Sequence, residues 1–459
     1  MPAFSEQLDY LYSLRTFGVK PGLARVRRLL AAVGQPQQAV PYIHIAGTNG
    51  KGSTAAMLAA ILQAAGLRVG LFTSPHLASF CERIQINGTP VAESDCGAVL
   101  AHVRAVAEAD ISAGEDHATF FEIVTVAAAL HFHNAKCQVV VWETGLGGRL
   151  DATNAVESVV ASVITPIALD HMQWLGPTIE SIAVEKAGII RPGRPVFTNV
   201  PDPAALRVIC ARCAELQAPL TYVAESARPA SEIDKKALQY HYISKGQAAF
   251  GLSMPALGIA DCAIGLRGKH QVANAALASA VAHWYLQVKS IAGGSQHITT
   301  GLRNASWPGR IQVLRDQPLV VLDCAHNPHG CAALIEALRE MHTGRWIVAF
   351  GALADKNAAE MLAMLNQIAD ELWYVPPSNA RALSCADVNG LCKDNLPGIH
   401  ISKNFASAPA LVHHIAQTLN DPRPMVIAGS CYLAGDMLTT WHGQPRDARG
   451  DDPVRLNSP

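Results

Sequence analysis

The chain has 459 residues, 50% of them hydrophobic and 16% charged, and a formal net charge of -1 at pH 7. This length exceeds what one hydrophobic core usually supports, so we expect two or three domains. A charge so close to zero gives no electrostatic reason to expect nucleic acid or an anionic membrane as the partner. The first ten residues lack a signal-peptide pattern and no apolar run reaches the ~20 residues of a membrane span, which favours a cytoplasmic protein.

The first apolar strand pattern, YIHIA at 42–46, runs into a glycine-rich turn with an embedded lysine, GTNGKGST at 47–54. Backbone amides of such a turn, with the amino terminus of the following helix, gather around phosphate, and Lys51 can reach the terminal phosphates. The spacing departs from the general phosphate-loop pattern, because Ala46 stands in place of its first glycine and Gly52 in place of its hydroxyl residue. We interpret the turn as a phosphate site; glycine used for packing alone is the weaker alternative.

Short apolar, β-branched runs alternate with helical patterns along the rest of the chain, which is typical of parallel sheets covered on both faces. We predict an α/β fold of two domains, an N-terminal P-loop ATPase-like domain with a mostly parallel sheet and a C-terminal Rossmann-like α/β domain. A stretch rich in glycine and proline marks the junction near Asn304. The predicted domains are 1–304 and 305–442, followed by a polar, mobile tail at 443–459, and the less regular residues 200–265 are predicted to form short strands and turns on the first domain.

Eleven cysteines are spread from Cys81 to Cys431 without the dense spacing of a disulfide framework, so we expect reduced thiols. Cys210 and Cys213 form a CxxC pair within a helical pattern, but neither a second such pair nor a nearby histidine pair accompanies them. We therefore predict a packing role for this pair rather than a zinc site.

Polar residues follow several of the predicted strands. Ser74 comes after RVGLFT, Glu143 ends QVVVWE, and His171 lies shortly after VVASVIT. Carboxyl ends of parallel strands face one crevice, so these side chains should converge near the glycine-rich turn. Hydroxyl and carboxylate oxygens with one imidazole suit magnesium beside phosphate, and we place Ser74 and Glu143 on a first ion. The alternatives are an ordinary strand-end carboxylate for Glu143 and a structural histidine for His171.

The sequence allows two interpretations for each of two further residues. Asp151, in the turn that also carries Arg149, either holds substrate or only forms the turn. Lys186 follows a helix start at Thr178 and either pairs with Glu185 or lies buried near metal. A buried lysine with a depressed pKa can react with carbon dioxide and become an anionic carbamate that binds magnesium.

Seven motifs together resemble the folylpolyglutamate synthase family, of the bifunctional type that also acts as dihydrofolate synthase, within the Mur ligase superfamily. They occur in the family's order over nearly the whole chain: AGTNGKGS at 46–53, TSPHL at 73–77, ETGLGGRLDATN at 143–154, ALDHMQWLG at 168–176, EKAGI at 185–189, PGR at 308–310 and LDCAHNPHG at 322–330. The N-terminal segment near Gly18 to Pro21 matches the family only loosely, so polyglutamylation is the firmer part of the implied activity.

The resemblance implies a three-part site. The implied ATP contacts are Gly47, Thr48, Asn49, Gly50, Lys51, Gly52 and Ser53, joined by Asn274, Arg310 and Asp323 from later in the chain. The implied ligands of two magnesium ions are Ser74, Glu143, His171 and a carbamylated Lys186. The implied pteroate pocket comprises Thr119, Phe121, Glu122, Arg149, Leu150 and Asp151, with His326 and Ser430 for the incoming glutamate. Lys51, Lys186 and His326 are the implied catalytic residues, and Asp355 and Lys356 either line the interdomain cleft or form a solvated loop pair.

The reaction that this resemblance implies is ATP-dependent ligation of L-glutamate to dihydropteroate and to reduced folates through an acyl phosphate. A monomer is expected, with small molecules as its only partners. A ligase of muramyl nucleotides is the nearest rival, but too few residues precede the loop at 46 for the extra domain that such ligases use. A nucleotide switch without synthesis is disfavoured, because a switch has no evident need for Glu143, His171 and Lys186 together.

Overall fold

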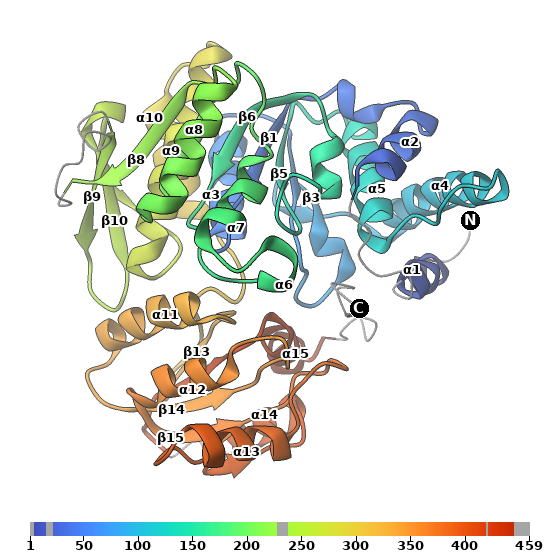
Figure 1. Cartoon of the computed structure of the whole chain (residues 1–459). Coiled ribbons are helices and arrows are strands. Elements are labelled where there is room, and N and C mark those ends of the chain that lie inside the picture. The colour runs from blue at the N-terminus through green and yellow to red at the C-terminus, as the bar shows by residue number, and fades with distance from the viewer. Residues whose placement is uncertain (1–3, 15–21, 227–236, 419–420, 445–459) are drawn as a thin grey trace.

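The computed structural model describes residues 4–14, 22–226, 237–418 and 421–444. Two α/β domains follow one another along the chain, as the sequence predicts, and the C-terminal domain, coloured orange to red, packs along one side of the larger N-terminal domain (Figure 1). The N-terminal part ends with α10 (Gly294–Asn304), and the first strand of the C-terminal sheet is β12 (Gln312–Asp316). In the described part of the chain, no helix combines the length and apolar character needed to cross a membrane.

The N-terminal domain is built on a sheet that has eleven strands among the described residues, in the order β11-β10-β9-β8-β7-β6-β1-β5-β2-β3-β4. From β9 to β2 the neighbouring strands run parallel, and β10, β11, β3 and β4 add antiparallel edges. The strands are β1 (Tyr42–Ala46), β2 (Val69–Phe72), β3 (Ile84–Ile86), β4 (Thr89–Pro90), β5 (Val139–Glu143), β6 (Val159–Ile164), β7 (Val196–Thr198), β8 (Leu220–Glu225), β9 (Leu238–Ser244), β10 (Phe250–Met254) and β11 (Ile259–Ala263).

Helices cover both faces of this sheet (Figure 1). They are α1 (Phe4–Ser13), α2 (Ala24–Ala32), α3 (Lys51–Ala64), α4 (Glu93–Ser112), α5 (Phe120–Asn134), α6 (Met172–Leu175), α7 (Ile179–Ala187), α8 (Pro203–Glu215), α9 (Lys269–Val288) and α10. The central strands β1 and β5 are buried along their whole length, as expected for Val- and Ile-rich strands with helices on both sides. The predicted decoration at 200–265 forms α8 and the strands β8 to β11, which extend the sheet.

The C-terminal domain has a second sheet, with the order β12-β13-β17-β14-β15-β16. All its neighbouring strands run parallel except the β12–β13 pair. Its elements are β12, β13 (Leu319–Leu322), α11 (Pro328–Met341), β14 (Trp346–Phe350), α12 (Ala358–Asn366), β15 (Ala369–Tyr374), α13 (Cys385–Asn395), β16 (Lys403–Asn404), α14 (Ala408–Gln417), β17 (Met425–Ala428) and α15 (Cys431–Trp441). The polar tail predicted at 443–459 lies outside the described residues apart from its first two positions.

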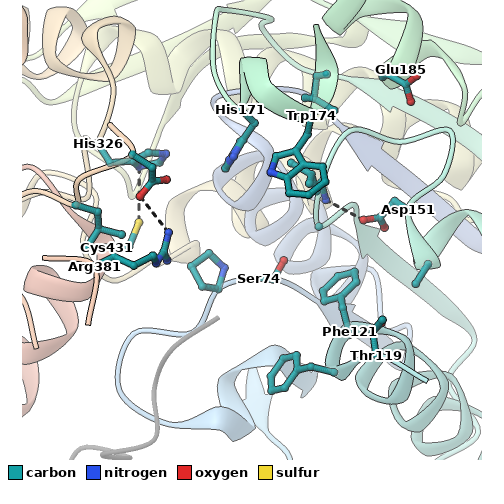
Figure 2. Close-up of a pocket in the computed structure, with 18 of the residues that line it drawn as sticks. Ser74, Thr119, Phe121, Asp151, His171, Trp174, Glu185, His326, Arg381 and Cys431 are labelled. Atoms are coloured by element: carbon teal, nitrogen blue, oxygen red, sulfur yellow. Dashed lines mark hydrogen bonds and ion pairs between the residues drawn. The ribbon is translucent and has the colours of Figure 1, made fainter. Parts of the chain in front are cut away.

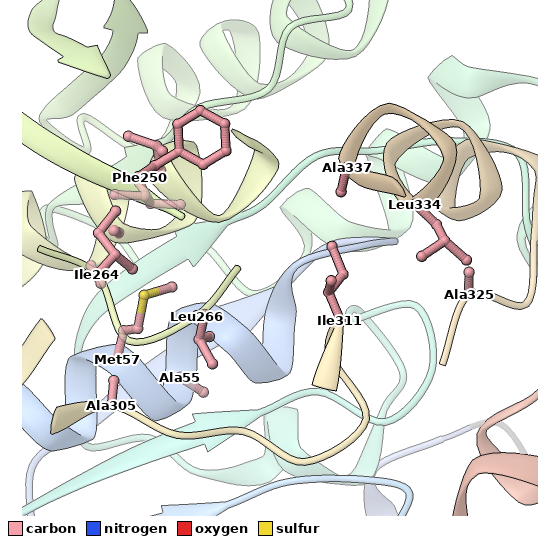
Figure 3. Close-up of a cluster of buried hydrophobic side chains, with 14 of the residues drawn as sticks. Ala55, Met57, Phe250, Ile264, Leu266, Ala305, Ile311, Ala325, Leu334 and Ala337 are labelled. Atoms are coloured by element: carbon pink, nitrogen blue, oxygen red, sulfur yellow. The ribbon is translucent and has the colours of Figure 1, made fainter. Parts of the chain in front are cut away.

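The main apolar core surrounds α3, whose alanine-rich sequence is buried on nearly every side. Helices α9 and α10 pack directly on it. Gly301 of α10 permits this close approach, because a Cβ there would lie 2.3 Å from the Cα of Ile61. The same cluster continues through Ile311 to Leu334 of α11, so it joins the two domains (Figure 3). Cys213 packs in a smaller apolar cluster with α7 and α8.

His44 lies in the centre of β1 with no exposed surface, and its Nε2 contacts the hydroxyls of Thr153 at 2.9 Å and Thr144 at 3.0 Å. Burial, with a smaller contribution from Arg191, lowers the pKa of His44 to about 3. The folded state therefore holds His44 neutral, whereas the unfolded chain protonates it below its ordinary pKa of ~6.5.

We expect this histidine to make the protein sensitive to acid. The stability due to neutral His44 is fully present above pH ~6.5 and is lost as the pH falls toward the folded-state pKa, by ~1.4 kcal/mol per pH unit. Denaturant unfolding between pH 7.5 and 5 should show a shallower pH dependence for His44→Gln, whose amide can still bond a threonine hydroxyl. Equal slopes for the two proteins would contradict this role.

Candidate functional site

The glycine-rich turn after β1 has a backbone that only glycine allows at two positions. Gly50 has φ +88°, and a Cβ on Gly47 would lie 1.8 Å from the Thr165 hydroxyl oxygen. Helix α3 begins at Lys51, and no side chain caps its first turn. The first backbone amides of the helix therefore face the glycine-rich turn without a capping side chain. The ammonium of Lys51 folds back to donate to the carbonyls of Gly47 and Thr48, at 3.0 and 3.1 Å. This combination of amides, dipole and ammonium suits a polyphosphate.

Two residues predicted to bind phosphate also have structural partners. The amides of Thr48 and Asn49 both donate to the carbonyl of Pro166, at 2.9 and 3.2 Å. The side chain of Asn49 reaches the other domain, where its Nδ2 donates to Asn327 Oδ1 at 3.3 Å and lies 2.9 Å from His329 Nδ1. The turn is thus tied to α11.

The three later residues predicted for ATP come from α9 and from the start of the C-terminal domain. Asn274 of α9 faces it, since a Cβ on Gly50 would approach Asn274 Oδ1 to 2.6 Å. Asp323, after β13, is buried and accepts hydrogen bonds from the amides of Ile311 and Ala325 at 2.9 and 2.7 Å. Arg310 lies near Asp323 and Glu143. Its positive charge opposes the effect of burial, which raises the pKa of both carboxyls.

Glu143 ends β5 and is 4% exposed. Burial raises its pKa to about 7, against the opposing effects of Lys51, the Ser74 amide and Arg310. Ser74 and Glu143 therefore lie together beside Lys51, as the sequence predicts. A carboxylate held this close to its ionisation point in a buried place gains charge readily when a cation arrives.

The described residues include no group of three or more His, Cys, Asp and Glu side chains placed to hold a metal ion. A magnesium ion that shares ATP phosphates needs only one or two protein ligands, so the hydroxyl of Ser74 and the carboxylate of Glu143 fit such an ion. His171 precedes the first residue of α6 as its N-cap, with φ +51°, and its Nε2 lies 3.9 Å from Asp170 Oδ1. Burial lowers the pKa of His171 to about 3, which leaves a neutral imidazole there.

Lys186 lies on α7, which begins with a capping box of Thr178 and Ser181. Its Nζ donates to the Gly47 carbonyl at 2.7 Å, and the side chain is buried. Glu185 instead pairs with Arg149 at 2.8 Å, so the alternative of a Lys186–Glu185 ion pair is wrong. Burial, and then the charge of Lys51, lower the pKa of Lys186 to about 7, the condition that carbamylation requires.

A network of polar contacts joins the domains at Asp170. The Lys356 ammonium donates to its Oδ1 at 2.8 Å, and Asn327 Nδ2 donates to its Oδ2 at 3.3 Å. His326 Nε2 lies 3.7 Å from the same Oδ2. Burial opposes ionisation of Asp170, but His326, His171 and Lys356 hold the pKa of this carboxyl well below its usual range. Lys356 thus belongs to the interdomain cleft, and the alternative of a solvated loop pair is wrong.

A cavity of about 320 Å³ opens beside this network, with walls from both domains (Figure 2). Every residue predicted for substrate lines it: Thr119, Phe121, Glu122, Arg149, Leu150, Asp151, His326 and Ser430. Ser74 and His171 also reach the cavity. Ser74 therefore connects this cavity with Glu143, whose pKa also responds to Lys51 of the glycine-rich turn.

Several of these lining residues also hold the backbone in place. Thr119 caps α5 in a capping box with Glu122, whose carboxylate pairs with Arg25 at 3.2 Å. Asp151 accepts hydrogen bonds from the amides of Leu146 and Thr153, at 2.8 and 3.0 Å. The turn-forming interpretation of Asp151 is thus correct, and its place on the cavity wall leaves the substrate interpretation open as well.

Other wall residues were not predicted from the sequence: Pro75, Trp174, Leu175, Arg381, Cys431 and Tyr432. Trp174 and Leu175 fall inside the quoted motif at 168–176, where their apolar character was the available signal. Arg381 pairs with Asp355 at 3.1 Å and lies over the Tyr432 ring at 5.9 Å. It lies in a loop without any recognisable motif, so only the fold brings it to the cavity.

Comparison with known proteins agrees with this geometry. Residues 45–282 match the model of the Mur ligase middle domain, and residues 309–431 match that of the Mur ligase glutamate ligase domain. Fold and site therefore define a Mur ligase, an ATP-dependent ligase that joins a carboxylate to an amine.

The relatives narrow this class further. The chain is 36% identical to the dihydrofolate synthase/folylpolyglutamate synthase of Bacillus subtilis, over 95% of this chain and 98% of that protein. It is 34% identical to the Escherichia coli protein of the same name, over 81% of each chain. The chain belongs to the dihydrofolate synthase/folylpolyglutamate synthase family, as its motifs predict.

Solved structures show the same fold. Escherichia coli FolC, in complex with DHPP and ADP, superposes with a TM-score of 0.81 at 29% identity and covers 96% of this chain and 98% of its own. Mycobacterium tuberculosis folylpolyglutamate synthase, complexed with ADP and AMPPCP, superposes with a TM-score of 0.82 at 28% identity, over 96% of this chain and 100% of its own. The predicted two-domain α/β fold is thereby confirmed.

Proposed function

We propose that this chain is an ATP-dependent ligase that adds L-glutamate to dihydropteroate, forming dihydrofolate, and to the glutamate tail of reduced folates. Membership of a family whose relatives carry both activities in their names supports this proposal. The observation that carries it is the cavity with walls from both domains, which Ser74 connects with Glu143, whose pKa responds to Lys51 of the glycine-rich turn.

The proposed reaction has two steps. A carboxylate of the folate precursor attacks the γ-phosphate of ATP and forms an acyl phosphate, and the amine of glutamate then displaces phosphate to leave an amide. Lys51 and Arg310 would offset the negative charge on the transferring phosphoryl group. Residues of both domains line the cavity, so closure would exclude water from the acyl phosphate.

His326 is proposed to bind the incoming glutamate. Burial lowers its pKa, but the contacts with Asp170 and Cys431 together raise the value to about 9, so the imidazole is charged at pH 7. A charged imidazole donates hydrogen bonds and cannot accept a proton from the amine. We therefore assign His326, together with Ser430, to holding and orienting glutamate through its carboxylates rather than to general-base catalysis.

We propose that Ser74, Glu143 and His171 would hold magnesium with ATP, and that Lys186 binds a second ion in its carbamylated form. Magnesium supplies charge neutralisation on the transferring phosphoryl group when bound. As an amine that donates to Gly47, Lys186 does not fit a cation, so the second ion requires the carbamate. Electron density at Lys186 in crystals grown with bicarbonate tests this assignment.

The remaining assignments are proposals of the same kind. ATP would contact the turn from Gly47 to Ser53 with Asn274 and Asp323, and pteroate would contact the wall formed by Thr119, Phe121, Glu122, Arg149, Leu150 and Asp151. Domain bounds of 1–304 and 305–442 are also proposed. From the near-neutral charge and the bacterial relatives we propose a cytoplasmic monomer, which light scattering after gel filtration tests for its mass.

The experiment that tests the function supplies purified protein with ATP, magnesium and radiolabelled glutamate, and offers 7,8-dihydropteroate and a reduced folate in separate reactions. We expect label in both products. Label with the reduced folate alone supports the alternative of a folylpolyglutamate synthase without the first activity. Label with neither acceptor contradicts the proposal and leaves another Mur-type amide ligase as the alternative, to be tested with other carboxylate acceptors.

A further inference from the structure

Two thiols meet on the C-terminal wall of the cavity. Cys324 lies shortly after β13 and Cys431 begins α15 shortly after β17, and these two strands are parallel neighbours. Cys431 Sγ lies 3.7 Å from the Cys324 carbonyl oxygen, and each thiol shifts the pKa of the other. Side chains from separate parts of the sequence are thus held together by the register of the sheet.

The two cysteines differ in access. Cys431 is half-buried and lines the cavity next to Ser430 and Tyr432, whereas Cys324 is 1% exposed. Figure 2 shows Cys431 beside His326 on one wall, across from Asp151 and Phe121. A small molecule that enters the cavity therefore reaches Cys431 first.

The surroundings of Cys431 favour its thiolate. Its Sγ lies 3.8 Å from His326 Nδ1. The Cys324 thiol, then His326 and Arg310, hold the pKa of Cys431 well below its usual range, against the opposing effect of burial. Cysteines in such electropositive, partly accessible places react with oxidants and electrophiles, whereas cysteines buried in apolar surroundings do not.

We propose that Cys431 and Cys324 form a reversible oxidation site, in which Cys431 is the attacking thiol, Cys324 is the resolving thiol and a hydroperoxide is the oxidant. The Cys431 thiolate attacks the O–O bond of the hydroperoxide, forms a sulfenic acid and releases an alcohol, or water when the oxidant is hydrogen peroxide. The Cys324 sulfur then attacks the sulfenic sulfur and expels hydroxide, which leaves as water with the Cys324 proton. Two thiols are oxidised to one disulfide while one peroxide is reduced.

The disulfide would change the wall that faces glutamate. It would link the residue just before Ala325 and His326 to the residue just after Ser430, and remove the Cys431 sulfur from its contact with His326. We therefore expect oxidation to lower ligase activity and dithiothreitol to restore it. This consequence rests on the proposed function, whereas the oxidation chemistry does not, so the decisive readout is chemical.

The first test compares alkylation rates in the folded protein by mass spectrometry. Cys210 and Cys385 are internal controls, because they are also half-buried but lie away from the cavity wall. Limiting iodoacetamide at pH 7 should label Cys431 about tenfold faster than either control, since the labelling rate follows the thiolate fraction. Equal rates for the three cysteines would overturn the proposal.

The second test treats the full chain with hydrogen peroxide, blocks remaining thiols and maps peptides without reduction. We expect a cross-link between the tryptic peptide that contains Cys324 and the peptide that contains Cys431. Cys331 shares the Cys324 peptide, so loss of the cross-link in Cys324→Ala identifies the partner, and this variant should accumulate dimedone-reactive Cys431. The Cys210→Ser control should retain the cross-link. A treated protein with neither the cross-link nor dimedone labelling of Cys431 would overturn the proposal.

Discussion

Replacing Lys51 by alanine is expected to lower the turnover number ~100- to 1000-fold, the effect typical of losing one preorganised charge at a transition state. Lys51 lies at the amino terminus of α3 with its ammonium over the phosphate turn, and it also acts on buried Glu143. Under the proposed function, its loss removes the positive charge that would face the terminal phosphates. Hydroxylamine trapping of the acyl phosphate separates this first step from amide formation, and we expect the trapped hydroxamate to fall with the turnover.

The control for this variant is Lys289→Ala, at the exposed carboxyl-terminal end of α9. It removes the same side chain far from the turn and should leave turnover unchanged. Circular dichroism should show both variants folded, because Lys51 bonds only carbonyls of its own turn among the described residues. Near-normal turnover in Lys51→Ala would remove the turn from the mechanism.

Breaking the Asp170–Lys356 pair is expected to lower kcat/KM by about 100-fold, which corresponds to ~3 kcal/mol of lost interaction. This pair joins two segments 186 residues apart and is nearly buried, with side chains 10% and 11% exposed. Asp170→Asn leaves the Lys356 ammonium and charged His326 without their carboxylate, so the cost of domain closure rises. The effect should fall on the Michaelis constant for glutamate as well as on turnover, because His326 shares the same carboxylate.

A double-mutant cycle with Asp170→Asn and Lys356→Met measures the coupling directly. We expect the double variant to be impaired less than the sum of the single effects, by ~1–3 kcal/mol. The matched control is the exposed pair of Lys245 and Asp261, also 2.8 Å apart, whose coupling should stay below ~1 kcal/mol. Additive effects at Asp170 and Lys356 would show that the pair does not support closure.

The fold was largely predictable, because its signals are local. Apolar β-branched runs mark the central strands, and the alternation with helices implies parallel sheets with right-handed crossovers. The antiparallel strands β10 and β11 were not predicted as sheet edges. The sequence of a short strand with mixed polarity does not indicate which strand it pairs with. Pairing of strands depends on register between segments, which a pattern along one segment does not contain.

The candidate site was predictable where motifs carry it and unpredictable elsewhere. Residues predicted for substrate do line one cavity, yet Arg381 and Cys431 reach the same wall without any motif. Lys186 shows the difference in a single residue. Its neighbour Glu185 is the natural partner along the chain, but the fold pairs Glu185 with Arg149 and directs Lys186 to Gly47.

The sequence alone was sufficient to predict the glycine-rich turn, because its glycines, its lysine and the helix that follows are contiguous from Gly47 to Ala64. Protonation states and the meeting of the two domains were decided by the tertiary structure. Burial raises the pKa of Glu143 and lowers that of Lys186, and burial is a property of the assembled core. Asp170 binds Lys356 across the domain boundary because folding brings two loops that are distant in the sequence into contact. The site that both domains form therefore exists only in the folded chain.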